Sequence, residues 1–438
     1  MTVTAPSGAD PDRPARPGPA SRILLRSSWQ TANIGDVAHS PGAVRAWQRF
    51  APSAEVTLWP RRLGRRERAM LDLAFPGLPI VDGDIDGDGR ASTPELQQAW
   101  DAADLLVHGS AADVVVVDDF TAWARSDRPY GYFGVSVDAV GPWVGGTLSE
   151  LETLVRALPA GYMDPRLAEL LSGAAFVYCR DSLSLAYARG QGVGSDVLEW
   201  GADATFTFDL RDDRAADAIL ARHGLRAGEF VCVVPRTRYA PYHLLRNYPP
   251  ERRDHLRDAV NAAHLDADLR AVVDVIVRIA RDTGMSVLVC PEMRHAVDLA
   301  RDEIMPRLPA DVRRRVVRLP DYWEVHHASA VYARARAVVS MDCHSPILAI
   351  GQGTPAVYLR LPTETAKGTM FADLGLESMT VEVGPDAADA VMHELAGTGR
   401  TSSRLDGVRA AHARATESLR SMAERSAAVA DGSRAARR

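Results

Sequence analysis

A short polar stretch, Asp342-Cys343-His344, lies between two apolar segments in the last quarter of the sequence. The preceding run, AVVSM, has the character of a buried strand, and the apolar stretch SPILAIG follows. A histidine titrates near neutral pH, so its ring can both give and take a proton. At the carboxyl end of a buried parallel strand, where such sheets bind ligands, His344 suits proton transfer and Asp342 could orient it. The alternative is a structural histidine that only satisfies hydrogen bonds.

Three cationic side chains follow other predicted strands. Arg236 and Arg238 emerge at the end of the apolar run EFVCVVPR, and Lys367 lies on a loop after the strand-like PAVYL. A guanidinium can hold a carboxylate or phosphate through two parallel hydrogen bonds. We therefore expect Arg236 and Arg238 to bind a carboxylate or phosphate, and Lys367 could reach the same cleft as His344. A pair of arginines on the surface is the competing interpretation.

The segment TANIGD joins a predicted strand at 22–27 to a helical segment. Backbone N–H groups at such a turn can bind an anion or a sugar hydroxyl. Asn33, Gly35 and Asp36 are therefore candidate acceptor residues at the cleft. Alternatively, Asn33 or Asp36 only caps the helix.

The acidic stretch DIDGDGRASTPE (84–95) has the spacing of an EF-hand calcium loop. Its candidate ligands are Asp84, Asp86, Asp88 and Glu95. The preceding residues FPGLPIVDG contain two prolines and two glycines, which do not suit the entering helix of an EF-hand. An acidic connector followed by a helix with Pro94 at its first position, capped by Ser92 or Thr93, explains the same residues. We favour the connector, assign no metal and keep calcium as a minor alternative.

The chain alternates short Val-rich runs with helical segments, for example RILLRS (22–27) and EFVCVVPR (229–236). Continuous apolar runs separated by helices predict parallel sheets covered on both faces. The length of 438 residues exceeds one ordinary core. We predict an α/β fold of two doubly wound domains that face each other across a cleft. The expected division is a disordered leader at 1–21, an N-terminal domain at 22–210, a C-terminal domain with the donor site at 211–404, and a polar, fraying helical tail at 405–438.

Composition excludes several classes of protein. The net charge of −6 gives no dominating basic field for nucleic acid. Four scattered cysteines fit a reducing cytosol better than a disulfide framework. The first residues lack the apolar core of a signal peptide, and no apolar run has the roughly 20 residues that span a bilayer. We expect a cytoplasmic protein, and the sequence leaves a homo-oligomer open.

Several of these segments, taken in order, resemble the polysaccharide pyruvyl transferase family. The resemblance rests on NIGD (33–36), AAFVYCRDSLSLAYARGQGV (174–193), ADATFTFD (202–209), and the late segments VVSMDCHSPILAIGQGTPAVYL and ETAKGTMFADLGL. It covers roughly residues 22–380, and the motifs are moderately specific when found together.

The resemblance implies two Rossmann-like domains, similar to B-type glycosyltransferases. It also implies transfer of a pyruvyl group from phosphoenolpyruvate to two hydroxyls of a sugar or sugar-containing metabolite, with no cofactor required. His344 matches the family histidine, expected as general acid/base, while Arg236 and Lys367 match residues expected to hold the donor. One departure stands out, because Asp342 occupies the position of a family arginine; Arg238 could supply the missing charge.

Two other functions fit the same architecture. One is a nucleotide-sugar-dependent glycosyltransferase of the B type. The other is a catalytically inactive relative that binds within a biosynthetic complex, which the change at Asp342 suggests.

Overall fold

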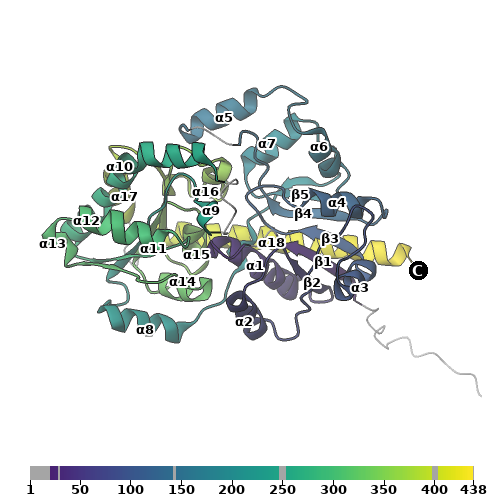
Figure 1. The fold of residues 1–438 in the computed structure, drawn as a ribbon, viewed down its shortest axis with the longest axis horizontal. Helices are drawn as coiled ribbons and strands as arrows, with labels where there is room; N and C mark the ends of the chain where they lie inside the picture. The colour runs from purple at the N-terminus through teal and green to yellow at the C-terminus, as the bar shows by residue number, and fades with distance from the viewer. Residues whose placement is uncertain (1–19, 28–29, 142–144, 246–252, 397–402, 438) are drawn as a thin grey trace, which may run out of the picture.

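The computed structural model describes residues 20–27, 30–141, 145–245, 253–396 and 403–437 (Figure 1). Nearly all of the predicted leader at 1–21 lies outside these residues. The described chain forms two six-stranded sheets, and every strand pair within them is parallel. The predicted α/β fold with parallel sheets is confirmed.

The first sheet has the strand order β2-β1-β3-β4-β5-β6. Its strands are β1 (Arg22–Ser27), β2 (Glu55–Pro60), β3 (Leu105–His108), β4 (Tyr130–Val135), β5 (Phe176–Cys179) and β6 (Leu198–Trp200). Every residue of β3, β4 and β5 is buried, because helices cover both faces of the sheet. This explains why the central strands have continuous rather than alternating apolar runs.

The second sheet has the order β12-β11-β10-β7-β8-β9. Its strands are β7 (Phe230–Val234), β8 (Ser286–Val289), β9 (Val316–Arg318), β10 (Ala337–Ser340), β11 (Ala356–Arg360) and β12 (Thr380–Glu382). The sequence did not predict β2, β6 or β12. All three are edge strands with partly exposed residues, so they lack the buried apolar run on which strand prediction depends.

Helices connect the strands and form the outer layers. In the first domain they are α1 (Ile34–Phe50), α2 (Arg65–Ala74), α3 (Pro94–Ala102), α4 (Val117–Ala124), α5 (Leu148–Ala157), α6 (Pro165–Ser172), α7 (Ser182–Gly190) and the 3-10 turn η1 (Ala204–Thr207). Those that follow are α8 (Asp213–His223), α9 (Tyr242–Leu245), α10 (His255–Arg278), η3 (Ile279–Thr283), α11 (Ala296–Leu299), η4 (Ala300–Ile304), α12 (Met305–Arg307), α13 (Ala310–Arg313), α14 (Val325–Tyr332), α15 (His344–Gly351), η5 (Ala366–Gly368), α16 (Thr369–Asp373), η6 (Glu377–Met379), α17 (Ala387–Ala396) and α18 (Ser403–Ala436).

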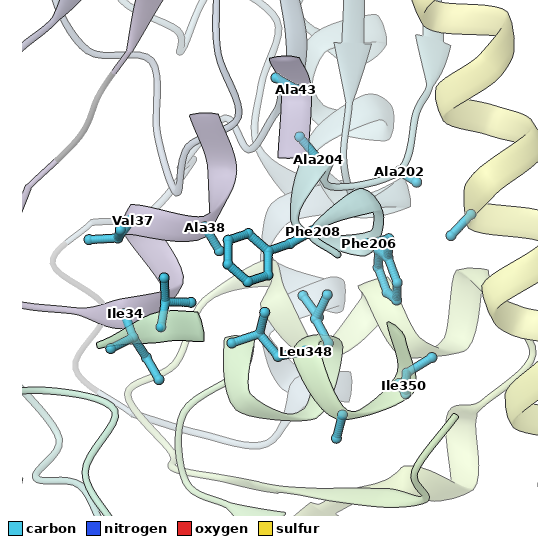
Figure 2. Close-up of a cluster of buried hydrophobic side chains, with 14 of the residues drawn as sticks. Ile34, Val37, Ala38, Ala43, Ala202, Ala204, Phe206, Phe208, Leu348 and Ile350 are labelled. Carbon is cyan, nitrogen blue, oxygen red and sulfur yellow. The ribbon is translucent and has the colours of Figure 1, made fainter. Parts of the chain in front are cut away.

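The two domains meet where α1 and η1 of the first pack against α15 of the second. Figure 2 shows apolar side chains from these three elements in one cluster, among them Phe206 and Leu348. Gly42 of α1 allows α1 and η1 to approach each other within the first domain, since a Cβ there would lie 2.0 Å from the carbonyl oxygen of Ala204. The proposed boundary near residue 210 falls between η1 and α8. The domain junction is therefore a packed core rather than a loose linker.

The C-terminal helix α18 differs from the fraying tail that the sequence suggested. It crosses from the second domain to the first and contacts α15, α1 and η1 (Figure 1, yellow). Its buried stripe recurs at helical spacing: Val408, Ala411, Ala415, Leu419 and Met422. The indole Nε1 of Trp47 donates to Ser426 Oγ at 2.8 Å. Small alanines in the stripe made a packed helix resemble a solvated one.

No helix in the described part of the chain is both long and apolar enough to cross a membrane.

Candidate active site

His344 is the first residue of α15, directly beyond the carboxyl end of β10. Its side chain is 3 % exposed, and both ring nitrogens face protein groups. Nδ1 lies 3.3 Å from Glu292 Oε1, and Nε2 lies 3.1 Å from Nε2 of His39. Glu292 follows β8 and His39 is on α1, so the imidazole is held between the two domains.

The predicted turn at 33–36 is part of the same site. Asn33 Oδ1 caps α1 by accepting from the backbone N–H of Gly35 at 2.6 Å. The same side chain donates through Nδ2 to Asp342 Oδ2 at 3.4 Å. Gly35 leaves room for the catalytic candidate, because a Cβ there would lie 2.2 Å from Cγ of His344. The cap interpretation is thus correct for Asn33, and the turn also contacts the predicted catalytic pair.

Asp36 lies one helical turn before His39. Its carboxylate, His39 and His344 each offer a ligand atom within 4.8 Å of the others, and Asp36 accepts a hydrogen bond from Gln30. The side chain is only partly buried, unlike the two imidazoles. Gly35 and Asp36 therefore lie beside His344, and Asn33 contacts Asp342.

Two of the three predicted donor-binding cations meet at one carboxylate. Glu364 Oε1 lies 2.6 Å from Arg236 Nη1, and Glu364 Oε2 lies 2.8 Å from Lys367 Nζ. Arg236 Nη1 also lies 3.5 Å from Asp342 Oδ2. A chain of contacts thus joins Lys367, through Arg236, to the carboxylate that neighbours His344.

Arg238 is not part of this network. Its guanidinium makes a bidentate pair with the buried Asp268, with distances of 2.7 Å and 2.9 Å. Arg238, the third cation expected to bind the donor, is therefore paired with a carboxylate on α10.

The sequence analysis missed five charged or titratable members of the site: Arg180, Asp203, His39, Glu292 and Glu364. Arg180 Nη1 pairs with Asp203 Oδ2 at 2.6 Å, and both side chains are fully buried. The same Asp203 oxygen lies 3.3 Å from His39 Nε2. Glu292 comes directly after a predicted strand, so the rule that singled out Arg236 could have found it. His39 stands inside a helix, where no local signal distinguishes it.

Burial and neighbouring charges set the protonation of the pair around Glu292. Burial first, and then the charge of Asp342, raise the pKa of Glu292 well above its usual range. Burial also opposes ionisation of Asp342, but Arg236 and Lys367 outweigh it and hold the pKa of Asp342 below its usual value. The two carboxyl groups are therefore shifted in opposite directions, so that Glu292 holds a proton more readily than Asp342 does.

The imidazole of His344 is neutral at pH 7. Burial, and next the neighbouring His39, lower the pKa of His344 to about 4. For Asp203, burial is outweighed by His39 and Arg180, which hold its pKa well below the usual range. Glu364 is likewise ionised, because Arg236 and Lys367 overcome burial and lower its pKa. The cations of the site are thus already paired with ionised carboxylates of the protein.

Three groups of described residues place possible metal ligands within 4.8 Å of one another: Asp36-His39-His344, Asp342-Cys343-His344 and Asp212-His326-His327. The acidic stretch at 84–95 does not form such a group in the described structure. Instead, Asp86 Oδ1 accepts from the backbone N–H groups of Asp88 and Arg90, each at 2.9 Å. Thr93 caps α3, which begins at Pro94, as the connector interpretation predicts.

Solved structures with the same architecture define the class of the fold. The chain resembles MnaA of S. aureus bound to UDP (TM-score 0.53, 10 % identity, 89 % of this chain and 90 % of that one). It also resembles Alr3699/HepE of Anabaena bound to UDP and glucose (TM-score 0.53, 12 % identity, 92 % and 98 % covered) and the UDP-GlcNAc 2-epimerase of Methanocaldococcus jannaschii (TM-score 0.53, 10 % identity, 88 % and 94 % covered). No curated protein matches the sequence. These likenesses establish a two-domain fold of the B-type glycosyltransferase kind.

The match to a protein family is more specific than the likeness in fold. The model of the polysaccharide pyruvyl transferase family matches residues 33–361, which include the α1 turn, Arg236 and His344. The chain belongs to this family and is a transferase.

Proposed function

We propose that this protein transfers a pyruvyl group from phosphoenolpyruvate to two hydroxyls of a sugar or sugar-containing metabolite, forming a ketal and releasing phosphate. One observation carries the proposal in a member of this family: His344, Arg236 and Lys367, from three separate segments, belong to one buried network at the domain junction. The acceptor would lie on the α1 side, beside Asn33, Gly35 and Asp36.

Ketal formation adds one proton to the methylene carbon of the donor and removes one from each of the two attacking hydroxyls, and the departing phosphate can take the second of these. Neutral His344 is suited to take the hydroxyl proton at Nε2. Glu292, at 3.3 Å from Nδ1, has a raised pKa and is suited to supply a proton to the methylene carbon. A carboxylic acid held neutral by its surroundings can act as an acid at pH 7. In this scheme the negative charge of Asp342 disfavours ionisation of the neighbouring Glu292.

The proposed donor is an anion, and the two cations proposed to bind it, Arg236 and Lys367, are paired with Glu364 in this structure. Glu364 now lies between Arg236 and Lys367 and is 3 % exposed. Phosphoenolpyruvate would replace that carboxylate, which requires the buried junction to open. Asp342, at the position of a family arginine, leaves Arg236 and Lys367 as the cations that could face the phosphate and carboxylate.

The alternative is a nucleotide-sugar-dependent glycosyltransferase. The architecture favours it, since the UDP-bound proteins described above share the fold. An inactive binding relative is the third reading, and the internal pairing of Arg236 and Lys367 favours that one. The proposed enzyme would work in the cytoplasm on small molecules, with no cofactor, calcium or nucleic acid, either alone or as a homo-oligomer.

Phosphate release from phosphoenolpyruvate, measured with a panel of sugars, glycolipids and nucleosides, tests the proposal. We expect release with at least one acceptor and loss of it in His344→Gln, with His326→Gln as a control histidine on α14. The melting temperature of the protein is also measured with UDP- and GDP-sugars. Stabilisation by a nucleotide sugar without phosphate release would reject pyruvyl transfer in favour of the glycosyltransferase.

A further inference from the structure

His39 has no role in the function proposed above, yet it makes the closest contact to the imidazole of His344. The two Nε2 atoms are 3.1 Å apart, and the rings meet edge to face with centroids 4.9 Å apart. His39 is 2 % exposed and belongs to α1, whereas His344 begins α15. The contact thus joins a residue of the first domain to the catalytic candidate of the second.

Asp203 determines that Nε2 of His39 carries a hydrogen. Its Oδ2 accepts from Arg180 at 2.6 Å, and its Oδ1 accepts from the backbone N–H of Thr205 at 2.8 Å. A carboxylate held by donors on both oxygens is an acceptor, and its Oδ2 lies 3.3 Å from His39 Nε2. A lone pair at that nitrogen would face a negative oxygen, so Nε2 of His39 carries the hydrogen.

The tautomer of His344 follows from that of His39. Because His39 Nε2 is a donor, the facing Nε2 of His344 must be the acceptor. The hydrogen of His344 is then on Nδ1, where it points at Glu292 Oε1. This carboxyl group is in turn held by Ser345, whose backbone N–H and hydroxyl donate to Oε2 at 2.7 Å and 2.5 Å.

The opposite arrangement fails on two counts. It would put the His39 hydrogen on Nδ1, a buried atom with no hydrogen-bond partner among the described residues. A buried donor without a partner is rarer and more costly than a buried acceptor without one. It would also direct the lone pair of His39 Nε2 at the Asp203 carboxylate.

We infer that His39 is a positioning residue, which donates from Nε2 to Nε2 of His344 and thereby fixes His344 as the Nδ1–H tautomer with its lone pair directed at the first domain. The inference rests on the proposed function for its meaning. In that reaction the sugar hydroxyl takes the place of the His39 N–H, and it meets a lone pair already oriented to accept its proton. As the methylene carbon takes a proton and the C=C π bond of the donor breaks, the hydroxyl oxygen bonds the donor carbon, its O–H bond breaks, and that proton moves to Nε2 of His344.

The groups that face the His344 ring come from several elements, and the variant must change only one of them. Besides His39, they are Asp203, Arg180, Asp342, Cys343 and Glu292. Glutamine at position 39 keeps an amide N–H near the place of the imidazole Nε2–H, while asparagine is one methylene shorter and cannot reach His344. The pair His39→Gln and His39→Asn therefore separates the hydrogen bond from the polarity of the side chain.

The test is the tautomer of His344, read from imidazole nitrogen resonances of the full-length protein labelled with ¹⁵N-histidine at pH 7. His344→Gln assigns the signal, and His326→Gln is the control. We expect the Nδ1–H form alone in the wild type, the control and His39→Gln, and a mixture with the Nε2–H form in His39→Asn. An Nε2–H tautomer in the wild type, or a spectrum of His344 unchanged in His39→Asn, would overturn the inference.

The readout does not depend on turnover. A protein that releases no phosphate from phosphoenolpyruvate would contradict the proposed function, and the tautomer would still decide the role of His39. If His39→Asn fails to fold, the wild-type tautomer alone supports or overturns the assignment.

Discussion

The carboxylate of Glu364 occupies the proposed anion site between Arg236 and Lys367. We expect Glu364→Gln to free this site, so that binding of an added anion can be measured. The substitution removes the charge between Arg236 and Lys367 but keeps the shape of the side chain. Removal of one partner from a buried ion pair typically costs about 3–5 kcal/mol, because the remaining charge is left buried. We expect the unfolding free energy of Glu364→Gln to fall by about that amount, measured by urea denaturation at pH 7.

Phosphoenolpyruvate should then restore stability to this variant. An anion at one hundred times its dissociation constant contributes about 2.7 kcal/mol. The wild type should gain less, since the ligand must first displace Glu364. Experiments at constant ionic strength with chloride separate specific binding from screening.

Asp268→Asn is the matched control for this experiment. It also leaves a buried arginine, Arg238, without its carboxylate partner, but outside the His344 network. We expect a similar loss of stability and no recovery with phosphoenolpyruvate. Equal gains in the wild type and both variants would refute a specific anion site at Glu364. A gain confined to Asp268→Asn would instead assign the donor to Arg238.

Three further outcomes are expected. The folded pKa of His344 is about 4 and its unfolded value about 6.5, so the unfolded chain binds more protons between these values. The unfolding free energy should therefore fall, by up to about 3 kcal/mol from this group, as the pH drops from about 6.5 to 4, and His344→Gln should flatten that slope in urea titrations. Gly35→Ala should abolish phosphate release and lower the melting temperature, since its Cβ would lie 2.2 Å from the His344 ring. As a control, Gly432→Ala places its Cβ where nothing lies within 4 Å, so it should be neutral or stabilising by up to about 1 kcal/mol. Ser426→Ala should cost about 1–3 kcal/mol in urea unfolding by leaving the buried indole N–H of Trp47 unpaired; a neutral result would show that α18 is not held there.

The sequence contains enough information for the central strands and for part of the site. Buried parallel strands such as β7 and β10 have continuous apolar runs, and polar residues at their carboxyl ends are conspicuous by contrast. That contrast predicted from the sequence alone that Arg236, Asp342 and His344 are site residues. It did not reveal the edge strands β2, β6 and β12, which are partly exposed.

The partners of those residues could not be predicted in the same way. His39 and Asp203 reach His344 only because two domains pack together, and pairing between distant segments has no signature in one sequence. The same limit explains Arg238, whose place after a strand resembled that of Arg236 although Asp268 on a distant helix holds it elsewhere. The charge of these side chains predicted that they would bind an anion, but not that Glu364 and Asp268 would be their partners.

The placement of α18 has a consequence for how the protein is made. This helix covers α1 and η1 and touches β1 and β3, yet it is translated after every strand of both sheets. In a nascent chain the first sheet is complete before α18 is translated, so the part of α1 that α18 covers, including the indole N–H of Trp47, lacks that partner until α18 has been made. The first domain therefore depends on a segment that follows both sheets in the sequence, and truncation ahead of α18 should destabilise it.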